Sequence, residues 1–407
     1  MPRLLVDVRP LRENRNFRLL FVGQLVSVLG SNLTLVAIPF EVYQKTHSSL
    51  WVGLASLFQL PCLIAGALWG GAMGDRFDKR KLLIVGSLVS ATLSGALALN
   101  ASVLHGDVVL LFVFAAVAAG AGGFTGPIRS AAIPKMVGGE QLIAAYSFNQ
   151  IIMNLGPFLG AALAGELIAA VGIASCYSID AISFVALAVF TIFMSPMKPE
   201  GEHAATAMLR AIGDGFRYVR GNALAQAVYL VDLNAMVFGL PRALFPAMAL
   251  TVYHGGPRTF GLLSAAPGAG ALVMAVLTGW IDRVRRQGRL IALVVIGWGA
   301  AMTLLGIVHL LWFGLLCLAV AGATDVISTI LRNTVLQNAI TDEFRSRISS
   351  VQMAVVTGGP RLGDAESGVV ASLTSTEISI VSGGLACIAG VIILLWRRPS
   401  FWKHDVS

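Results

Sequence analysis

The chain has 407 residues, of which 56% are hydrophobic and only 12% are charged. Soluble domains carry about 25% charged residues, so this composition excludes an ordinary water-soluble protein and indicates a polytopic membrane protein. The formal net charge of +8 would suggest a nucleic-acid partner in a soluble chain. Here the basic residues flank apolar runs, so we expect the lipid bilayer as a partner and no nucleic acid.

Charge-poor runs follow one another along the chain, and each is long enough to cross a bilayer as a helix, which takes about 20 residues. We predict an all-α polytopic membrane protein with twelve transmembrane helices, at about 17–42, 51–74, 82–103, 108–130, 142–168, 172–195, 222–250, 259–281, 289–310, 312–333, 346–373 and 377–396. Lys and Arg gather in every second connection, and such residues stay on the cytoplasmic side. We therefore expect a multi-pass protein of the cytoplasmic (inner) membrane with both termini in the cytoplasm.

A dense charge cluster, Asp75–Lys81, separates the second and third runs. A carboxylate at a helix end can face the positive N-terminus of a neighbouring helix, and basic side chains can pair across an interface. Contacts that form in one conformation and break in another would act as a latch. The simpler alternative is that the basic residues only set topology. The predicted conformational latch consists of Asp75, Arg76 and Arg80, with the similar pair Asp282 and Arg283 half a chain later.

The longest polar connection joins the sixth and seventh runs. Its second part, 206–220, has apolar side chains on one helical stripe and basic ones opposite, which predicts an amphipathic helix in the cytoplasmic interface. We expect three parts: an N-terminal six-helix bundle over 1–195, a cytoplasmic linker over 196–221 and a C-terminal six-helix bundle over 222–407.

The two halves share a repeat, which is clearest in the fifth and eleventh runs. Residues 155–165 match 358–368 at a constant offset, and the same offset aligns Arg129 with Arg332. Proline removes a helix hydrogen bond and small neighbours allow close helix approach, so both runs should bend. We interpret the bends as hinges of two pseudo-symmetric bundles, and a kink without motion is the alternative. The predicted hinge residues are Gly156, Pro157, Gly160, Gly359, Pro360 and Gly363.

These features resemble the major facilitator superfamily over nearly the whole chain. Its signature loop between helices two and three is similar to Gly71-x-x-x-Asp75-Arg76-x-x-Lys79-Arg80-Lys81. The Gly-Pro motif of its exporting, antiporter branch resembles Gly156-Pro157-x-x-Gly160. Three shorter motifs are similar to those of the group that exports enterobactin and macrolides: Asn16-Phe17-Arg18, Thr46-His47-Ser48 and Gly363-Asp364-Ala365.

Ionisable residues inside the predicted spans are functional candidates, because a charge near the bilayer centre costs several kcal/mol, about 3 or more. We expect that Asp232, Asp364 or Glu366 exchanges a proton, with Arg242 or Arg361 as its partner; the alternative is a static buried ion pair. Asp180 and Glu166 are expected to be interfacial. The coupling and substrate candidates are Asp232, Arg242, Asp325, Arg361, Asp364, Glu366, Gln24, Asn32, Tyr229, Asn234 and Phe238.

The resemblance implies a secondary active exporter of small amphipathic organic molecules, such as siderophores or drugs, that works by alternating access. Proton-coupled antiport and a monomeric state are expected. A lipid or lysolipid flippase of the same fold, or a membrane receptor without transport, are the alternatives. No enzyme is expected, because the six histidines are scattered and no Walker loop occurs. The four cysteines lack the spacing of metal ligands, so no metal or other cofactor is expected.

Overall fold

The computed structural model describes residues 7–104, 106–197, 206–339 and 345–402. Within these ranges the protein is built from helices and contains no strand. The helices fall into two compact units, which are described separately below.

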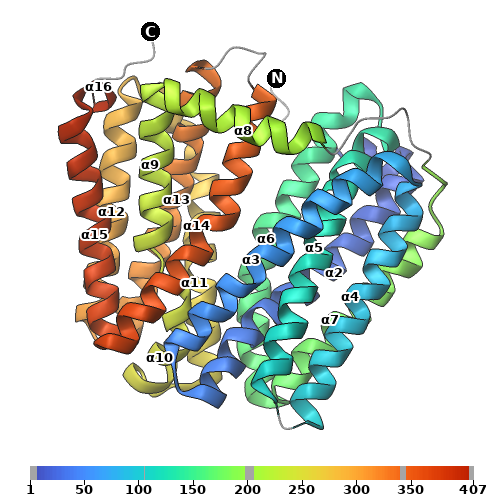
Figure 1. Cartoon of the computed structure of the whole chain (residues 1–407), viewed down its shortest axis with the longest axis horizontal. Coiled ribbons are helices and arrows are strands. Elements are labelled where there is room, and N and C mark those ends of the chain that lie inside the picture. The colour runs from blue at the N-terminus through green and yellow to red at the C-terminus, as the bar shows by residue number, and fades with distance from the viewer. Residues whose placement is uncertain (1–6, 105, 198–205, 340–344, 403–407) are drawn as a thin grey trace. The chain divides into compact units, whose positions relative to one another are not determined.

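Unit 1 comprises Met1–Lys45 and Phe58–Ala205. Helix α4 packs against α5 and α7, and α6 packs against α5 and α7. Figure 1 shows these helices in colours from blue to green. Their bounds are α1 (Arg9–Glu13), α2 (Arg15–Thr46), α3 (Ser49–Arg76, in unit 1 from Phe58 onward), α4 (Lys79–Ser102), α5 (Val108–Met136), the 3₁₀ turn η1 (Gly139–Gln141), α6 (Leu142–Ala170) and α7 (Ile173–Ile192).

Unit 2 comprises Thr46–Leu57 and Thr206–Ser407, and therefore includes the first turns of α3. Helix α12 packs against α13 and α15, which repeats the neighbours of α4 in unit 1. The bounds are α8 (Thr206–Gly221), α9 (Ala223–Phe238), η2 (Arg242–Leu244), α10 (Phe245–Ala247), η3 (Met248–Val252), α11 (Gly256–Val276), η4 (Thr278–Arg283), α12 (Gln287–Ile307), α13 (Leu311–Ala339), α14 (Arg345–Leu373), α15 (Thr376–Arg397) and α16 (Pro399–Trp402).

The predicted spans correspond to these helices. Among the described residues, 11 helical segments are long and apolar enough to cross a membrane. The predicted eleventh run is α14, a helix of 29 residues whose apolar character is reduced by Arg361, Asp364 and Glu366. The 11 segments and α14 together agree with the predicted all-α fold of twelve transmembrane helices.

Many large apolar side chains lie on the outside of both units. Ile143 is 82% exposed, Ile182 68% and Val276 85%. Monomeric soluble proteins rarely leave so much large apolar surface in water, whereas lipid tails cover it without cost. The exposed surface thus supports the membrane assignment that the composition gave.

The seventh predicted run, 222–250, corresponds to one membrane-length segment, Ala223–Val252, but its helix is interrupted. Helix α9 ends at Phe238, and the chain continues through η2, α10 and the π-helical turn η3. Pro241 has no backbone N–H to donate, and the break at Gly239 leaves a carbonyl group without its helical partner. The indole Nε1 of Trp298 on α12 donates a hydrogen bond of 2.5 Å to the carbonyl oxygen of Gly239. The break is therefore stabilised from a neighbouring helix of the same unit.

The predicted hinge glycines are places of close helix approach in each unit. A Cβ atom at Gly156 or Gly160 of α6 would collide with Val28 or Asn32 of α2. A Cβ atom at Gly359 or Gly363 of α14 would press against α9 at Met236 and Val237. The two halves of the sequence repeat thus make equivalent contacts. Pro157 and Pro360 lie inside α6 and α14, and bending in a transport cycle stays a prediction.

Helix α8 occupies the linker in which an amphipathic helix is predicted. It begins at Thr206, ends at Gly221 and packs against α9 and α14. The linker's boundaries and the two predicted six-helix domains stay predictions.

Candidate functional sites

The centre of unit 2 contains a buried ion pair between α9 and α13. A guanidinium nitrogen of Arg332 donates to a carboxylate oxygen of Asp232, and the two side chains are 3% and 2% exposed. The second terminal nitrogen donates to Thr329 Oγ1 at 3.0 Å and lies 3.8 Å from Asp325 Oδ1. Arg332 is thus surrounded by oxygen atoms from two carboxylates and a hydroxyl group.

The partner of Asp232 differs from the one that the sequence predicts. Arg242 lies on η2 with an exposed side chain, and Arg361 donates to the carbonyl oxygen of Thr357 at 2.9 Å. Among the described residues, neither arginine forms a hydrogen bond or an ion pair with Asp232. The prediction considered arginines near the acidic candidates along the sequence, whereas α13 brings Arg332 to Asp232 from 100 residues away.

Asp364 stabilises the broken segment after α9. Its carboxylate accepts hydrogen bonds from Ser56 Oγ at 2.7 Å and from the backbone N–H of Ala243 at 3.2 Å. Arg361, one of the expected partners of Asp364, forms no hydrogen bond with it in the described part of the chain; Arg361 donates to Thr357 instead. A buried carboxylate that accepts a backbone N–H at a helix break acts as a cap.

The remaining candidates of unit 2 lie on α9 and α14. Asn234 donates to the carbonyl oxygen of Cys387 at 2.8 Å and so joins α9 to α15. Tyr229 is buried, at 6% exposure. Phe238 lies at the end of α9, and Glu366 is half-buried on α14.

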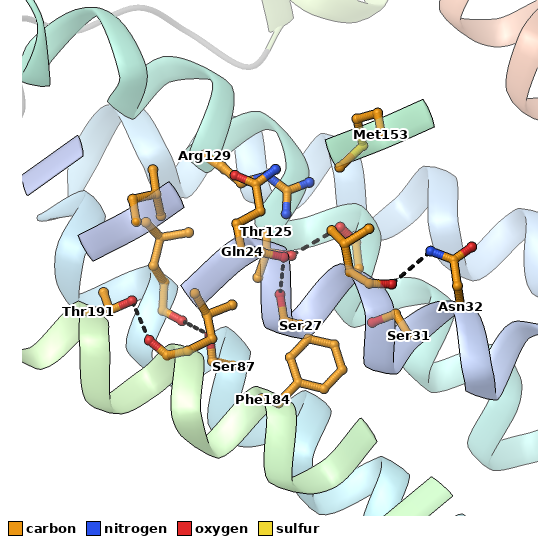
Figure 2. A pocket seen from close by; sticks show the side chains of 15 residues that line it. Gln24, Ser27, Ser31, Asn32, Ser87, Thr125, Arg129, Met153, Phe184 and Thr191 are labelled. Atoms are coloured by element: carbon orange, nitrogen blue, oxygen red, sulfur yellow. Dashed lines mark hydrogen bonds between the residues drawn. The ribbon is translucent and has the colours of Figure 1, made fainter. Parts of the chain in front are cut away.

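Unit 1 holds a cavity of about 270 Å³ between α2, α4, α5, α6 and α7. Gln24 and Asn32, both predicted substrate candidates, line it, and Figure 2 shows them with their neighbours. Gln24 Nε2 donates to Asn149 Oδ1 at 2.8 Å, and Asn32 Nδ2 donates to the carbonyl oxygen of Val28 at 2.7 Å. Apolar walls come from residues such as Met153.

Arg129 on α5 also lines this cavity, and sequence reasoning did not select it as a site residue. Its guanidinium appears in Figure 2 with the amide of Gln24 at the same part of the cavity. The available signal was the repeat, which aligns Arg129 with Arg332. This alignment did not by itself indicate a site, because a basic residue near the end of a span can also serve only to set the membrane topology.

Asp180 on α7, which we expected to be interfacial, is buried inside unit 1 at 2% exposure. Thr34 Oγ1 and Ser94 Oγ each donate to Asp180 Oδ2 at 2.8 Å, and Ser31 Oγ donates to Oδ1 at 3.3 Å. Hydroxyl groups from α2 and α4 thus take the place of a cation. Single Ser and Thr residues in apolar helices gave no sequence signal of this convergence.

The predicted latch region caps helices within unit 1. Asp78 accepts hydrogen bonds from the backbone N–H groups of Arg80 at 2.9 Å and Met197 at 3.0 Å, so it is the N-cap of α4. The Arg80 guanidinium donates to the carbonyl oxygen of Ile192, at the end of α7. Asp75 is half-buried at the end of α3, and Arg76 is exposed. The side chains of Asp282 and Arg283 lie outside the described part of the structure.

Buried ionisable side chains between apolar helices are typical of membrane transport proteins. The family model described as "Transmembrane secretion effector" matches residues 7–406. The chain therefore belongs to this family, within the major facilitator superfamily, and is a multi-pass membrane exporter.

Curated relatives cover nearly the whole chain. The enterobactin exporter EntS of Citrobacter koseri is 27% identical over 403 residues, which are 96% of this chain and 94% of the relative. The EntS protein of Escherichia coli O1:K1 / APEC is 26% identical over 400 residues, with the same shares.

Solved transporter structures share the fold. The nucleoside transporter NupG has a TM-score of 0.72 at 12% identity, covering 96% of this chain and 99% of that chain. A peptide transporter POT in complex with sulfate has a TM-score of 0.69 at 14% identity, covering 97% and 96%. At such identities the likeness concerns the fold alone.

Proposed function

We propose that this protein is a secondary active exporter of small amphipathic organic molecules, of the siderophore or drug type, driven by proton antiport. The observation that carries the proposal is the similarity to enterobactin exporters over 96% of the chain. The buried charges of unit 2 supply groups that can change protonation. Each unit contributes one bundle to an alternating-access cycle, as parallel-repeat transporters do.

Asp232 is the proposed coupling residue. In a low-dielectric interior its ionised form is stabilised by Arg332, and protonation would remove that attraction. The released guanidinium would then move toward Asp325, whose nearer carboxylate oxygen is 3.8 Å away. A proton on Asp232 would thus change the contacts between α9 and α13. Asp364 is the alternative, because its protonation would weaken the cap of the helix break.

The conformational parts of the proposal are the latch and the hinges. Asp75 and Arg76 would hold the cytoplasmic gate, with Arg80, Asp282 and Arg283 as supporting charges. The close contacts at Gly156, Gly160, Gly359 and Gly363 would let α6 and α14 rock on α2 and α9. The cycle would need no cofactor, and a monomer would carry it out.

The test is transport by inside-out proteoliposomes with an imposed pH gradient, acidic inside, using enterobactin and a macrolide as separate probes. The wild-type protein should accumulate at least one probe only while the gradient exists. Asp232→Asn should lose gradient-driven accumulation, and Asp75→Asn should lose transport at normal protein content. Glu140→Gln is the matched control, because it neutralises an exposed carboxylate of unit 1 that takes no part in this network.

Accumulation that ignores the gradient would remove proton coupling, and failure to move either probe would remove the proposed substrate class. Movement of a fluorescent lysolipid between leaflets, without export of the probes, would favour a flippase.

A further inference from the structure

The two arginines aligned by the repeat have different surroundings. In unit 2, Arg332 is neutralised by Asp232 and lies near Asp325. In unit 1, Arg129 faces the cavity, and the residues that line this cavity include no carboxylate. Within the described part of the chain, Arg129 forms neither an ion pair nor a hydrogen bond. Arg129, at the position equivalent to Arg332, thus has no counter-charge within that part of the chain.

The other polar groups of the cavity do not replace that counter-charge. The hydroxyl protons of Ser27, Ser87 and Thr125 are donated to backbone carbonyl oxygens of their own helices, at 3.3, 2.7 and 3.2 Å. The Gln24 amide donates to Asn149. Among the residues that line the cavity, the guanidinium of Arg129 is thus the charged hydrogen-bond donor. A planar guanidinium matches a carboxylate with two parallel hydrogen bonds.

The rest of the cavity indicates which kind of anion fits. Phe184, Met153 and Leu187 provide an aromatic and apolar wall, which suits a ring or a short hydrocarbon body. A volume of about 270 Å³ exceeds what one water molecule or one small inorganic ion requires. Ser31 lines the cavity and donates to Asp180 at 3.3 Å, so the Asp180 carboxyl group lies behind Ser31. A bound anion would keep its charged end at Arg129, away from Asp180.

We propose that the cavity of unit 1 binds the carboxylate or phenolate group of a small aromatic or aliphatic organic acid, with Arg129 as its charged ligand. The inference rests on the proposed export function, since it assigns an anionic group to the exported molecule. A cation between membrane helices without a counter-charge costs about 3 kcal/mol or more, and the bound anion offsets this cost.

The test is calorimetric binding of 2-naphthoate and its neutral analogue 2-naphthamide to the full chain in nanodiscs of zwitterionic lipid. The variants are Arg129→Gln, Arg129→Lys and, as a matched control that removes an exposed cation from the same unit, Arg12→Gln. The wild-type protein and Arg12→Gln should prefer naphthoate by roughly 10- to 100-fold, as expected for a hydrogen bond to a charged group. Arg129→Gln should bind both probes equally, and Arg129→Lys should keep part of the preference.

Equal binding of the two probes by the wild-type protein, or an unchanged preference in Arg129→Gln, would overturn the proposal. Unchanged naphthamide binding by Arg129→Gln would show that the variant is folded. Loss of the naphthoate preference in nanodiscs containing phosphatidylglycerol would assign the site to a lipid headgroup and overturn its assignment to an exported acid. Binding needs neither a gradient nor transport, so a vesicle assay without export would remove the proposed function and leave this site intact.

Discussion

Two buried carboxylates, one in each unit, are stabilised in different ways. Asp180 in unit 1 is surrounded by hydroxyl groups of Thr34 and Ser94, whereas Asp232 in unit 2 is paired with Arg332. Hydroxyl donors carry no net charge, so a neutral carboxyl group leaves no uncompensated charge beside them. A guanidinium differs, because it keeps its charge in the interior when its partner loses its own. Neutralising the carboxylate would therefore leave an unpaired charge in unit 2 and none in unit 1.

The largest expected effect is that of Asp232→Asn, which leaves Arg332 buried without its main counter-charge. Breaking a buried ion pair from one side costs about 3–5 kcal/mol, and we expect a loss of this size in the free energy of unfolding, measured by denaturation in mixed micelles. The double variant Asp232→Asn with Arg332→Gln should recover most of it. A double variant as unstable as the single one would show that packing, and not the stranded charge, dominates at this site.

A smaller effect is expected for Thr34→Val, which keeps the shape of the side chain and removes one hydroxyl donor to Asp180. A hydrogen bond to a charged group contributes about 1.5–3 kcal/mol, and the loss should appear in the same unfolding measurement. Thr92→Val is the control, because its hydroxyl group bonds only to the backbone of its own helix in an exposed position. Equal costs for the two variants would mean that the hydroxyl groups around Asp180 do not stabilise a charge.

The smallest expected effect concerns the glycines at equivalent positions of the repeat, one in each unit. Gly160→Ala and Gly363→Ala each place a methyl group against a neighbouring helix, and overpacking of this kind costs about 1–3 kcal/mol. Gly122→Ala is the control, since nothing lies within 4 Å of a Cβ atom there. Similar losses at both repeat positions would support equivalent roles; a loss confined to one would contradict the symmetry of the hinges.

Much of the fold could be predicted from the sequence. The spans followed from charge-poor runs, because the bilayer requires apolar segments of a certain length. The positions of close helix contact at Gly156 and Gly363 followed from small residues beside proline. The break at Gly239–Pro241 could have been anticipated from its proline, yet its stability depends on Trp298 and Asp364, which come from distant helices.

The candidate sites were less predictable. Asp232 stood out because an ionisable residue in an apolar run is rare, but its partner Arg332 lies on another helix. Arg129 and Asp180 were present in the sequence without any local sign of their surroundings. One depends on a cavity formed by five helices, and the other on hydroxyl groups from two of them.

The sequence alone therefore determined that this protein is a helical membrane protein with a repeated architecture, because hydrophobicity and chain periodicity are properties of contiguous segments. Which charges are neutralised, and which one faces an open cavity, was decided only by the tertiary structure. Electrostatic interactions depend on distance in space, and helix packing brings together residues that the chain keeps about 100 positions apart.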